Sequence, residues 1–317
     1  MSSITAILAG AWLSFASVSL GVLAVGVALH VGKLCAEARA WHWIVSHAHD
    51  PAPVRFRTTL AAFVSSIGAN AVLPARVGEA LRVGVLRREV PGSSVITIAA
   101  TIVLETAIEV AFGAAIIATV LLAGGSFGSD GSTPALPGLA AQPAVLGALV
   151  CLALTAVVLG LVYLKRARAL FRRMAAGFSI VRSPRAFVAG VLSWKLVAWA
   201  LRLGSVYAFL LAFHVPAAPW TALVVVAAQN VAASVPLLPG NAGTQQAAIG
   251  VALAGSASAA ALLGFGVGMQ AMTMIADLVL GAAAITLVAN RRDVRSAFAT
   301  LRLRQPARPA GAVARGG

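Results

Sequence analysis

The sequence predicts an all-α polytopic membrane protein: an inverted repeat of span, re-entrant helical hairpin and span, joined by a connecting span. Hydrophobic residues fill 60% of the 317 positions and charged residues only 10%, whereas soluble domains carry about 25% charged residues. Several apolar runs exceed the roughly 20 residues that a membrane helix needs. Two other apolar runs are too short to cross twice and contain Pro and Gly, which favours hairpins over pairs of spans.

The net charge of +15 indicates membrane topology and gives no support to a nucleic-acid partner. Of the 24 Lys and Arg residues, fourteen lie in two clusters, Lys165–Arg185 and Arg291–Arg315, each directly after an apolar run. Such clusters mark the cytoplasmic ends of membrane helices. We therefore expect a multi-pass plasma-membrane protein with its N-terminus outside. Residues 1–290 form one transmembrane domain, and residues 291–317 form a basic cytoplasmic tail whose composition predicts disorder.

The first repeat is expected at about residues 4–122. The uncharged run Ile4–Val31 lacks the basic start of a cleavable signal and is predicted to be a permanent span. Thr58–Leu86 offers 29 residues, whereas two crossings and a turn need more than about 40. We expect a hairpin there that enters and leaves on the cytoplasmic side and turns near Ala71–Arg76. Ser93–Leu122 then crosses outward and precedes an external loop.

The second repeat is expected at about residues 186–290, after a connecting span and a basic surface helix at about residues 144–185. Ala186–Phe213 crosses outward. Thr221–Gly255 holds 35 uncharged residues, again too few for two crossings, so we expect a hairpin entered from outside. Ser256–Val288 crosses back to the cytoplasm, and the two repeats thus have opposite orientations.

Two similar motifs fall on the two predicted hairpin turns. Pro74 and Gly78 in the first motif match Pro239 and Gly243 in the second at a constant offset of 165 positions. Transporters with inverted repeats place their sites at broken helices near the bilayer midplane, so both turns are candidate sites. The expected turn-forming residues are Pro74, Gly78, Pro239, Gly240 and Gly243.

Polar and charged side chains inside the apolar regions are the candidate site residues. Each charge at the bilayer centre costs about 2.5–3.5 kcal/mol on insertion scales, so these groups must pair or face water. One interpretation is a set of buried ion pairs that hold the helices in register, with Asp277 paired to Lys195 or Arg202. The other is a wet cavity that takes a charged headgroup. The candidates are Asn70, Arg76, Glu79, Arg82, Glu105, Glu109, Lys195, Arg202, Asn241, Gln245, Gln246 and Asp277.

The sequence contains no recognisable catalytic or metal-binding motif. No serine nucleophile elbow, phosphate-binding loop or HExxH pattern occurs. Cys35 and Cys151 have no histidine neighbours at metal-ligand spacing. We therefore expect no catalytic residue, no metal and no cofactor.

The segment from Asn70 to Arg82, followed by Glu105 and Glu109 and then by the motif ending at Gln246, resembles the transmembrane region of lysylphosphatidylglycerol synthases. This family is also called flippase-like, and the resemblance covers residues 5–290. It implies handling of a lipid headgroup, most often translocation of a modified phospholipid or glycolipid between leaflets. The synthase members carry a soluble domain that transfers an aminoacyl group from tRNA, whereas only 27 residues follow Asn290 here. The resemblance therefore implies membrane lipids as partners and does not imply an enzymatic activity for this chain.

Three functions remain open at this point. The first is a flippase whose basic side chains contact the phosphate of an anionic phospholipid or glycolipid, while its carboxylates balance or select other groups. The second is a membrane enzyme or accessory subunit that acts on lipid-linked sugars or aminoacyl lipids, with Glu79 or Glu105 as a general base. The third is a scaffold for a partner synthase or glycosyltransferase.

Overall fold

The computed structural model contains only helices among its regular elements, within the part of the chain that it describes. Four helical stretches there are long and apolar enough to cross a membrane. They are α2 (Leu20–Ala48), α5 (Val95–Ala123), the stretch Pro184–Ala212, and α12 (Ala259–Val288). The described residues are 17–50, 53–73, 77–90, 92–123, 174–233, 241 and 243–288.

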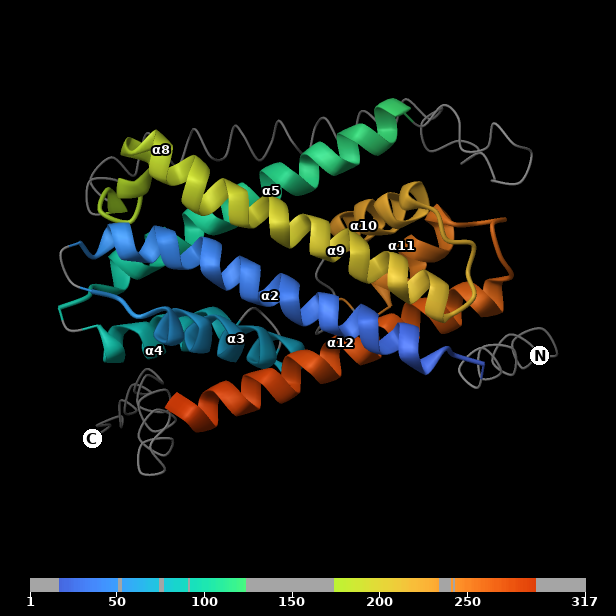
Figure 1. Ribbon diagram of the computed structural model, residues 1–317, viewed down its shortest axis with the longest axis horizontal. Coiled ribbons are helices and arrows are strands. Elements are labelled where there is room, and N and C mark those ends of the chain that lie inside the picture. Colours follow the sequence, from blue (N-terminus) through green and yellow to red (C-terminus); the bar gives the residue numbers. More distant parts are fainter. Residues whose placement is uncertain are drawn as a thin grey trace, which may run out of the picture.

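The long helices run side by side along the longest axis of the molecule (Figure 1). The stretch from Pro184 consists of α8 (Pro184–Ala186), the π-helical η2 (Phe187–Leu192) and α9 (Ser193–Ala212). Helices α2 and α9 share the most extensive helix contact, and α12 packs against α3 (Phe56–Val72).

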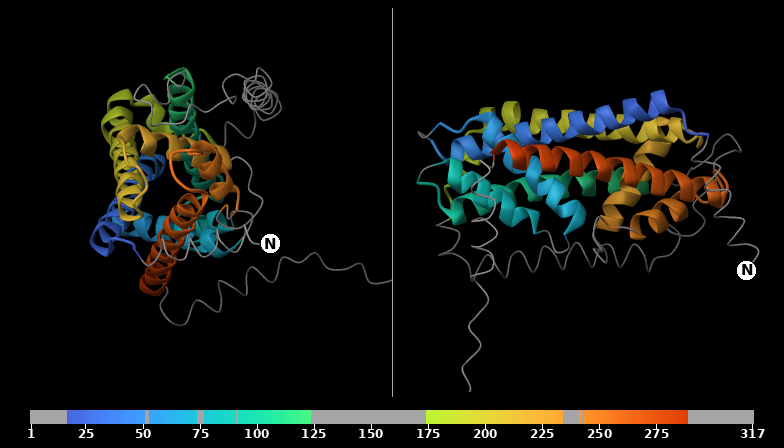
Figure 2. Two further views of the ribbon diagram at one scale, coloured as in Figure 1. Left: turned by 90° about the vertical axis from the view of Figure 1, so that its right-hand side faces the viewer. Right: turned by 90° about the horizontal axis from the view of Figure 1, so that it is seen from below.

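Two pairs of short helices occupy opposite ends of this bundle (Figures 1 and 2). Helix α3 and α4 (Gly78–Glu89) pack together at the end where α2 stops and α5 starts. Helices α10 (Pro219–Ala233) and α11 (Thr244–Ala252) pack together at the other end. The two pairs fall on the two intervals in which the sequence predicts hairpins.

Each short helix pair contributes to its own apolar core. One core contains Trp41, Phe63 and Leu86, from α2, α3 and α4. The other contains Phe209, Val225, Ile249 and Phe265, from α9 to α12.

The contact between α3 and α12 depends on two glycines. A Cβ atom at Gly68 would lie 2.8 Å from the Cα atom of Gly281, and a Cβ at Gly281 would lie 2.7 Å from the Cα of Gly68. Membrane helices lack a hydrophobic driving force toward one another and associate through close packing at small residues. The glycine pair therefore sets how closely α12 approaches the first short helix pair.

The first long helix differs from its sequence prediction. A span over Ile4–Val31 was expected; residues 4–16 lie outside the described residues, and the described helix α2 covers Leu20–Ala48, so it continues well beyond Val31. The backbone leaves helical geometry at Ser19, whose N–H donates to the Ala212 carbonyl oxygen at 3.1 Å. At the other end, Lys33 and Glu37 do not stop the helix because they form an ion pair of 3.4 Å one turn apart.

Other predicted segments lie wholly or partly outside the described residues. The external loop, the connecting span and the cytoplasmic tail belong to residues 124–173 and 289–317, which the structure does not describe. The described part of the predicted surface helix, from residue 174, forms turns and the 3₁₀ helix η1 (Ser179–Arg182). A continuous α-helix through residue 185 is therefore wrong, because the backbone tightens into 3₁₀ geometry before Pro184.

Candidate functional site

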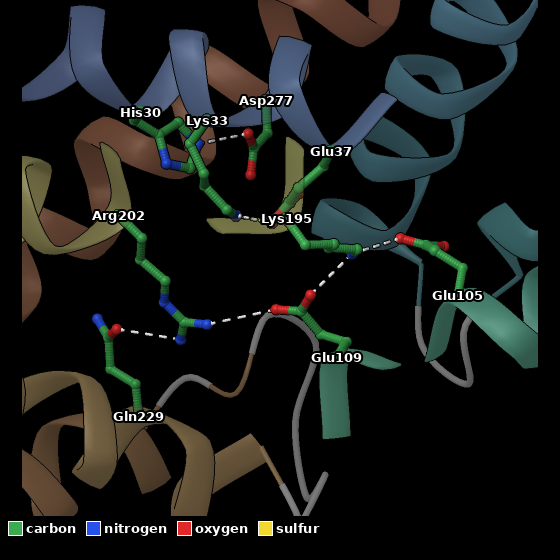
Figure 3. A network of polar contacts seen from close by, with 9 residues as sticks. All are labelled: His30, Lys33, Glu37, Glu105, Glu109, Lys195, Arg202, Gln229 and Asp277. Carbon is green, nitrogen blue, oxygen red and sulfur yellow. Dashed lines mark hydrogen bonds and ion pairs between the residues drawn. The ribbon is translucent and has the colours of Figure 1, made fainter. Parts of the chain in front are cut away.

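Buried and half-buried charges of alternating sign link α4, α5 and α9. Arg82 lies 2.9 Å from Glu105, which lies 3.1 Å from Lys195. Lys195 lies 2.8 Å from Glu109, whose second oxygen lies 3.8 Å from Arg202 (Figure 3). The two glutamates are one turn apart on α5, and the two bases are two turns apart on α9, so each pair shares a helix face. The structure thus brings these five predicted residues together in one chain of charge contacts.

Arg82 is enclosed by its neighbours at the first end of this chain. It is only 3% exposed, and its guanidinium carbon lies 3.6 Å from the ring centre of Trp41 and 4.7 Å from that of Phe63. Glu79 lies 3.8 Å away, a longer contact than the one to Glu105. This surrounding fits the ion-pair interpretation: Arg82 joins α4 to α2, α3 and α5.

The described part of the first turn is packed tightly around a glycine. The N–H of Gly78 donates to the side-chain oxygen of Asn70 at 2.8 Å. A Cβ atom at Gly78 would lie 2.1 Å from the Ser66 carbonyl oxygen, so only glycine fits there. Asn70 therefore acts as a cap for α4 and fastens it to α3. Pro74 and Arg76, also predicted for this turn, lie outside the described residues.

The second short helix pair borders a polar cavity of about 210 Å³. Its lining residues come from α2, α9, α10, α11, α12 and the turn before α11. Two basic side chains, Lys33 and Arg202, are among them, and the described lining residues include no carboxylate. The lining residues are His30, Lys33, Arg202, Ser205, Val206, Phe209, Gln229, Ala233, Asn241, Gln245, Met269 and Thr273.

Arg202 borders this cavity, and its polar contacts within the described part of the chain are long. Its guanidinium lies 3.8 Å from Glu109 and 3.4 Å from the side-chain oxygen of Gln229, and it lies 4.7 Å from the ring centre of Trp199 (Figure 3). Its side chain is 20% exposed, whereas that of Arg82 is 4% exposed. A guanidinium with long contacts can turn its forked N–H groups toward an incoming anion.

Asp277 pairs with a residue that the sequence prediction did not include. The expected partner was Lys195 or Arg202, but the carboxylate lies 2.8 Å from Nε2 of His30 (Figure 3). The prediction was wrong because α12 places Asp277 against α2, whereas Lys195 already contacts two glutamates. His30, Lys33 and Glu37 were all missed as site residues. Their spacings of three and four positions put them on one helix face. This spacing is the sequence pattern that could have identified them as site residues.

The second turn uses two residues with positive φ before α11. Asn241 has φ 56° and Gly243 has φ 84°, which suits Asn and Gly better than other residue types. The N–H of Gly243 donates to the side-chain oxygen of Gln246 at 2.7 Å, and the Gln246 amide nitrogen donates to Gln270 on α12. The turn therefore directs Asn241 and Gln245 into the cavity and uses Gln246 to fasten α11. Pro239 and Gly240 lie outside the described residues.

Comparisons with known proteins show the family. The family model of the lysylphosphatidylglycerol synthase TM region matches residues 5–281. The chain belongs to this family, as its motifs indicated, and with its four long apolar helices it is a membrane protein. No curated protein and no solved structure matches the chain.

Proposed function

We propose that this member of the lysylphosphatidylglycerol synthase TM region family binds the phosphate of a lipid headgroup in its polar cavity and moves the lipid between leaflets. The observation that carries the proposal is the lining of the cavity: Lys33 and Arg202 face it and no carboxylate is among its described lining residues. An intramembrane charge that faces a cavity marks a substrate pathway by default. The chain itself carries out no bond chemistry in this proposal.

The lining groups suit an anionic phospholipid or glycolipid. The planar guanidinium of Arg202 can donate two parallel hydrogen bonds to phosphate oxygens, and the Lys33 ammonium adds a compact positive charge. Gln229, Asn241 and Gln245 offer amide donors and acceptors to hydroxyl groups of a glycerol or sugar. A volume of about 210 Å³ takes part of a headgroup and no acyl chain.

The two short helix pairs are proposed to be re-entrant hairpins of an inverted repeat. Helices α3 and α4, with 17 and 12 residues, are about 26 and 18 Å long, and α10 and α11, with 15 and 9 residues, are about 22 and 14 Å long. All are shorter than the hydrocarbon core of about 30 Å. Their positions at opposite ends of the bundle support opposite orientations, with α3 and α4 entered from the cytoplasm of a plasma membrane.

Reconstitution tests this function directly. Purified protein in vesicles that contain fluorescent phosphatidylglycerol should expose inner-leaflet lipid to dithionite. Arg202→Gln should slow this exposure at least fivefold because the cavity loses its forked donor. Arg185→Gln is the matched control, since Arg185 is exposed on α8 and does not line the cavity. Equal rates for wild type and Arg202→Gln would exclude the cavity from lipid movement.

A second function is an accessory role beside a separate synthase. The name of the family supports it, because the matching region belongs to lysylphosphatidylglycerol synthases. In that role the chain binds the lipid that a partner synthase or glycosyltransferase makes or uses. Wild-type protein alone would then bind phosphatidylglycerol without moving it, and movement would need the partner.

A further inference from the structure

An apolar groove runs along the outside of the second short helix pair, between α11 and α12. It has a volume of about 990 Å³ and is lined mainly by glycine, alanine and aliphatic side chains. Gln246 and Gln270 are its amide-bearing lining residues, and they hydrogen-bond to each other. The groove thus satisfies its own polar groups and offers an apolar surface to an occupant.

The groove and the polar cavity lie on two sides of the same pair of helices. On α11, Gln245 lines the cavity and the next residue, Gln246, lines the groove. On α12, Met269 lines the cavity and Gln270 lines the groove. The contact between α11 and α12 therefore separates the two spaces, and the hydrogen bond between the two glutamines lies in that contact.

We infer that the groove holds an acyl chain of the lipid whose headgroup enters the cavity, and that the Gln246–Gln270 contact closes the passage between the two spaces. This inference rests on the proposed function, since it supplies the tail site for the same lipid. A lipid needs a polar site and an apolar site that are continuous. A passage between α11 and α12 provides that continuity, because the headgroup can replace the amide contact with hydrogen bonds of its own.

The groove is longer than one leaflet of hydrocarbon, so it has room for an acyl chain. On α12 its lining extends from Ala259 to Met274, fifteen residue steps or about 22 Å. One leaflet contributes about 15 Å of the hydrocarbon core. The groove starts at the end of the bundle and passes Gln270, which lies well inside α12. An acyl chain there would reach from the membrane surface to the level of the cavity.

Gly250 gives a way to fill the groove without disturbing its walls. Gly250 lines the groove, and a Cβ atom built on it meets no atom within 4 Å. A leucine there extends into the space in which we place the acyl chain. Gly21 on α2 is the matched control, because a Cβ atom there also meets nothing within 4 Å and Gly21 does not line the groove. Ala271→Leu, at an exposed groove position, is a second filling variant if Gly250→Leu does not fold.

The experiment uses the full chain in nanodiscs that contain phosphatidylglycerol with a photoreactive diazirine on one acyl chain. After illumination, mass spectrometry maps the labelled residues. Wild type should be labelled on the groove residues of α11 and α12, and Gly250→Leu should reduce that labelling at least fivefold. Gly21→Leu should leave it unchanged. Equal labelling of the groove in wild type and Gly250→Leu would overturn the inference, because lipid would then only surround the helices.

A second measurement separates this inference from the proposed function. Glycerophosphoglycerol, the headgroup without acyl chains, should bind wild type and Gly250→Leu equally and should bind Arg202→Gln at least tenfold more weakly. Loss of this binding in Gly250→Leu would overturn the groove inference, because the substitution would then act on the cavity. Unchanged binding in Arg202→Gln would reject the headgroup site while the photolabel still reports on the groove.

Discussion

The two arginines at the ends of the chain of charge contacts differ in burial. This difference gives them different roles. Arg82 lies against two aromatic rings and 2.9 Å from a glutamate, and its side chain is 4% exposed. Arg202 keeps contacts of 3.4 and 3.8 Å and borders a cavity. We therefore expect the same residue type to stabilise helix packing at one end of the chain of charge contacts and to bind an anion at the other.

The two glutamates that face Arg82 should differ strongly in their effect on stability. The side chain of Glu105 is 11% exposed and bridges Arg82 and Lys195, whereas that of Glu79 is 36% exposed and lies 3.8 Å from Arg82. Glu105→Gln leaves a buried arginine without its short ion pair and should cost about 3–5 kcal/mol. Glu79→Gln removes a longer contact, of 3.8 Å, made by a 36% exposed carboxylate, and should cost about 0–1 kcal/mol. Melting temperatures of both variants in one detergent check this order. A lower melting temperature for Glu79→Gln than for Glu105→Gln would contradict it.

The cap at the first turn should also be measurable. Asn70→Ala removes the acceptor of the Gly78 N–H and should destabilise the protein by about 1 kcal/mol, as loss of a helix cap does. Asn70→Asp keeps an acceptor oxygen at the same place and should restore most of the loss. Thermal unfolding of both variants tests the cap, and equal destabilisation by the two substitutions would contradict it.

Among the described residues, the four long apolar helices could be predicted from apolar length and charge position, but the ends of the elements could not. The two intervals that hold the short helix pairs could be identified because Thr58–Leu86 and Thr221–Gly255 are too short to cross twice. The start of α2 is not visible, since it depends on a hydrogen bond between Ser19 and Ala212. Long-range backbone contacts of this kind leave no local pattern in the sequence.

In the candidate site, too, contacts within one helix could be predicted from the sequence, and contacts between helices could not. Glu105 with Glu109, and Lys195 with Arg202, share helix faces that their spacing already predicts. The partner of Asp277 could not be predicted, because it depends on which helix α12 packs against. His30 was missed because only Asp, Glu, Lys and Arg were counted among the intramembrane charges, although His30 lies on the same helix face as Lys33.

At the level of elements, the close crossing of α3 and α12 should tolerate no added methyl group. Gly68→Ala would place a Cβ atom 2.8 Å from the Cα of Gly281, so the helices must separate and lose packing. Gly84→Ala on α4 is the control, since its Cβ meets nothing within 4 Å, and better helix propensity should stabilise it by up to about 1 kcal/mol. The two melting temperatures should therefore move in opposite directions. A rise for Gly68→Ala would show that the crossing is not close.

At the level of the whole molecule, the two short helix pairs are alike in arrangement and different in what they enclose. The pair α3–α4 surrounds Arg82 with aromatic rings and a glutamate, whereas the pair α10–α11 borders the polar cavity and the apolar groove. The charge chain of α5 and α9 connects the two ends. We therefore expect the first end to hold the bundle together and the second to open to lipid.

The membrane orientation of the two ends gives the last prediction. Arg55, Ser94 and Ser183 are exposed residues that flank α3, α4 and η1, at the end of the bundle that we place in the cytoplasm. Ala218 and Ser258 are exposed residues that flank α10 and α12, at the opposite end. Single cysteines at these positions, in a background without Cys35 and Cys151, can be tested with an impermeant thiol reagent on intact cells.

Only cysteines at positions 218 and 258 should react from outside, and those at 55, 94 and 183 should react after the membrane is opened. Positions 55 and 94 flank the first short helix pair, and positions 218 and 258 flank the second. If the two positions of a set lie on the same side of the membrane, the helix pair between them enters and leaves the membrane on that side. Clustered Lys and Arg favour the cytoplasmic assignment of the first set. Labelling of 55 and 94 on opposite sides would turn α3–α4 into a membrane crossing and remove the inverted repeat. Reversed labelling of both sets would keep the hairpins and invert the molecule, so the cavity at the second pair would then receive its lipid from the cytoplasmic leaflet.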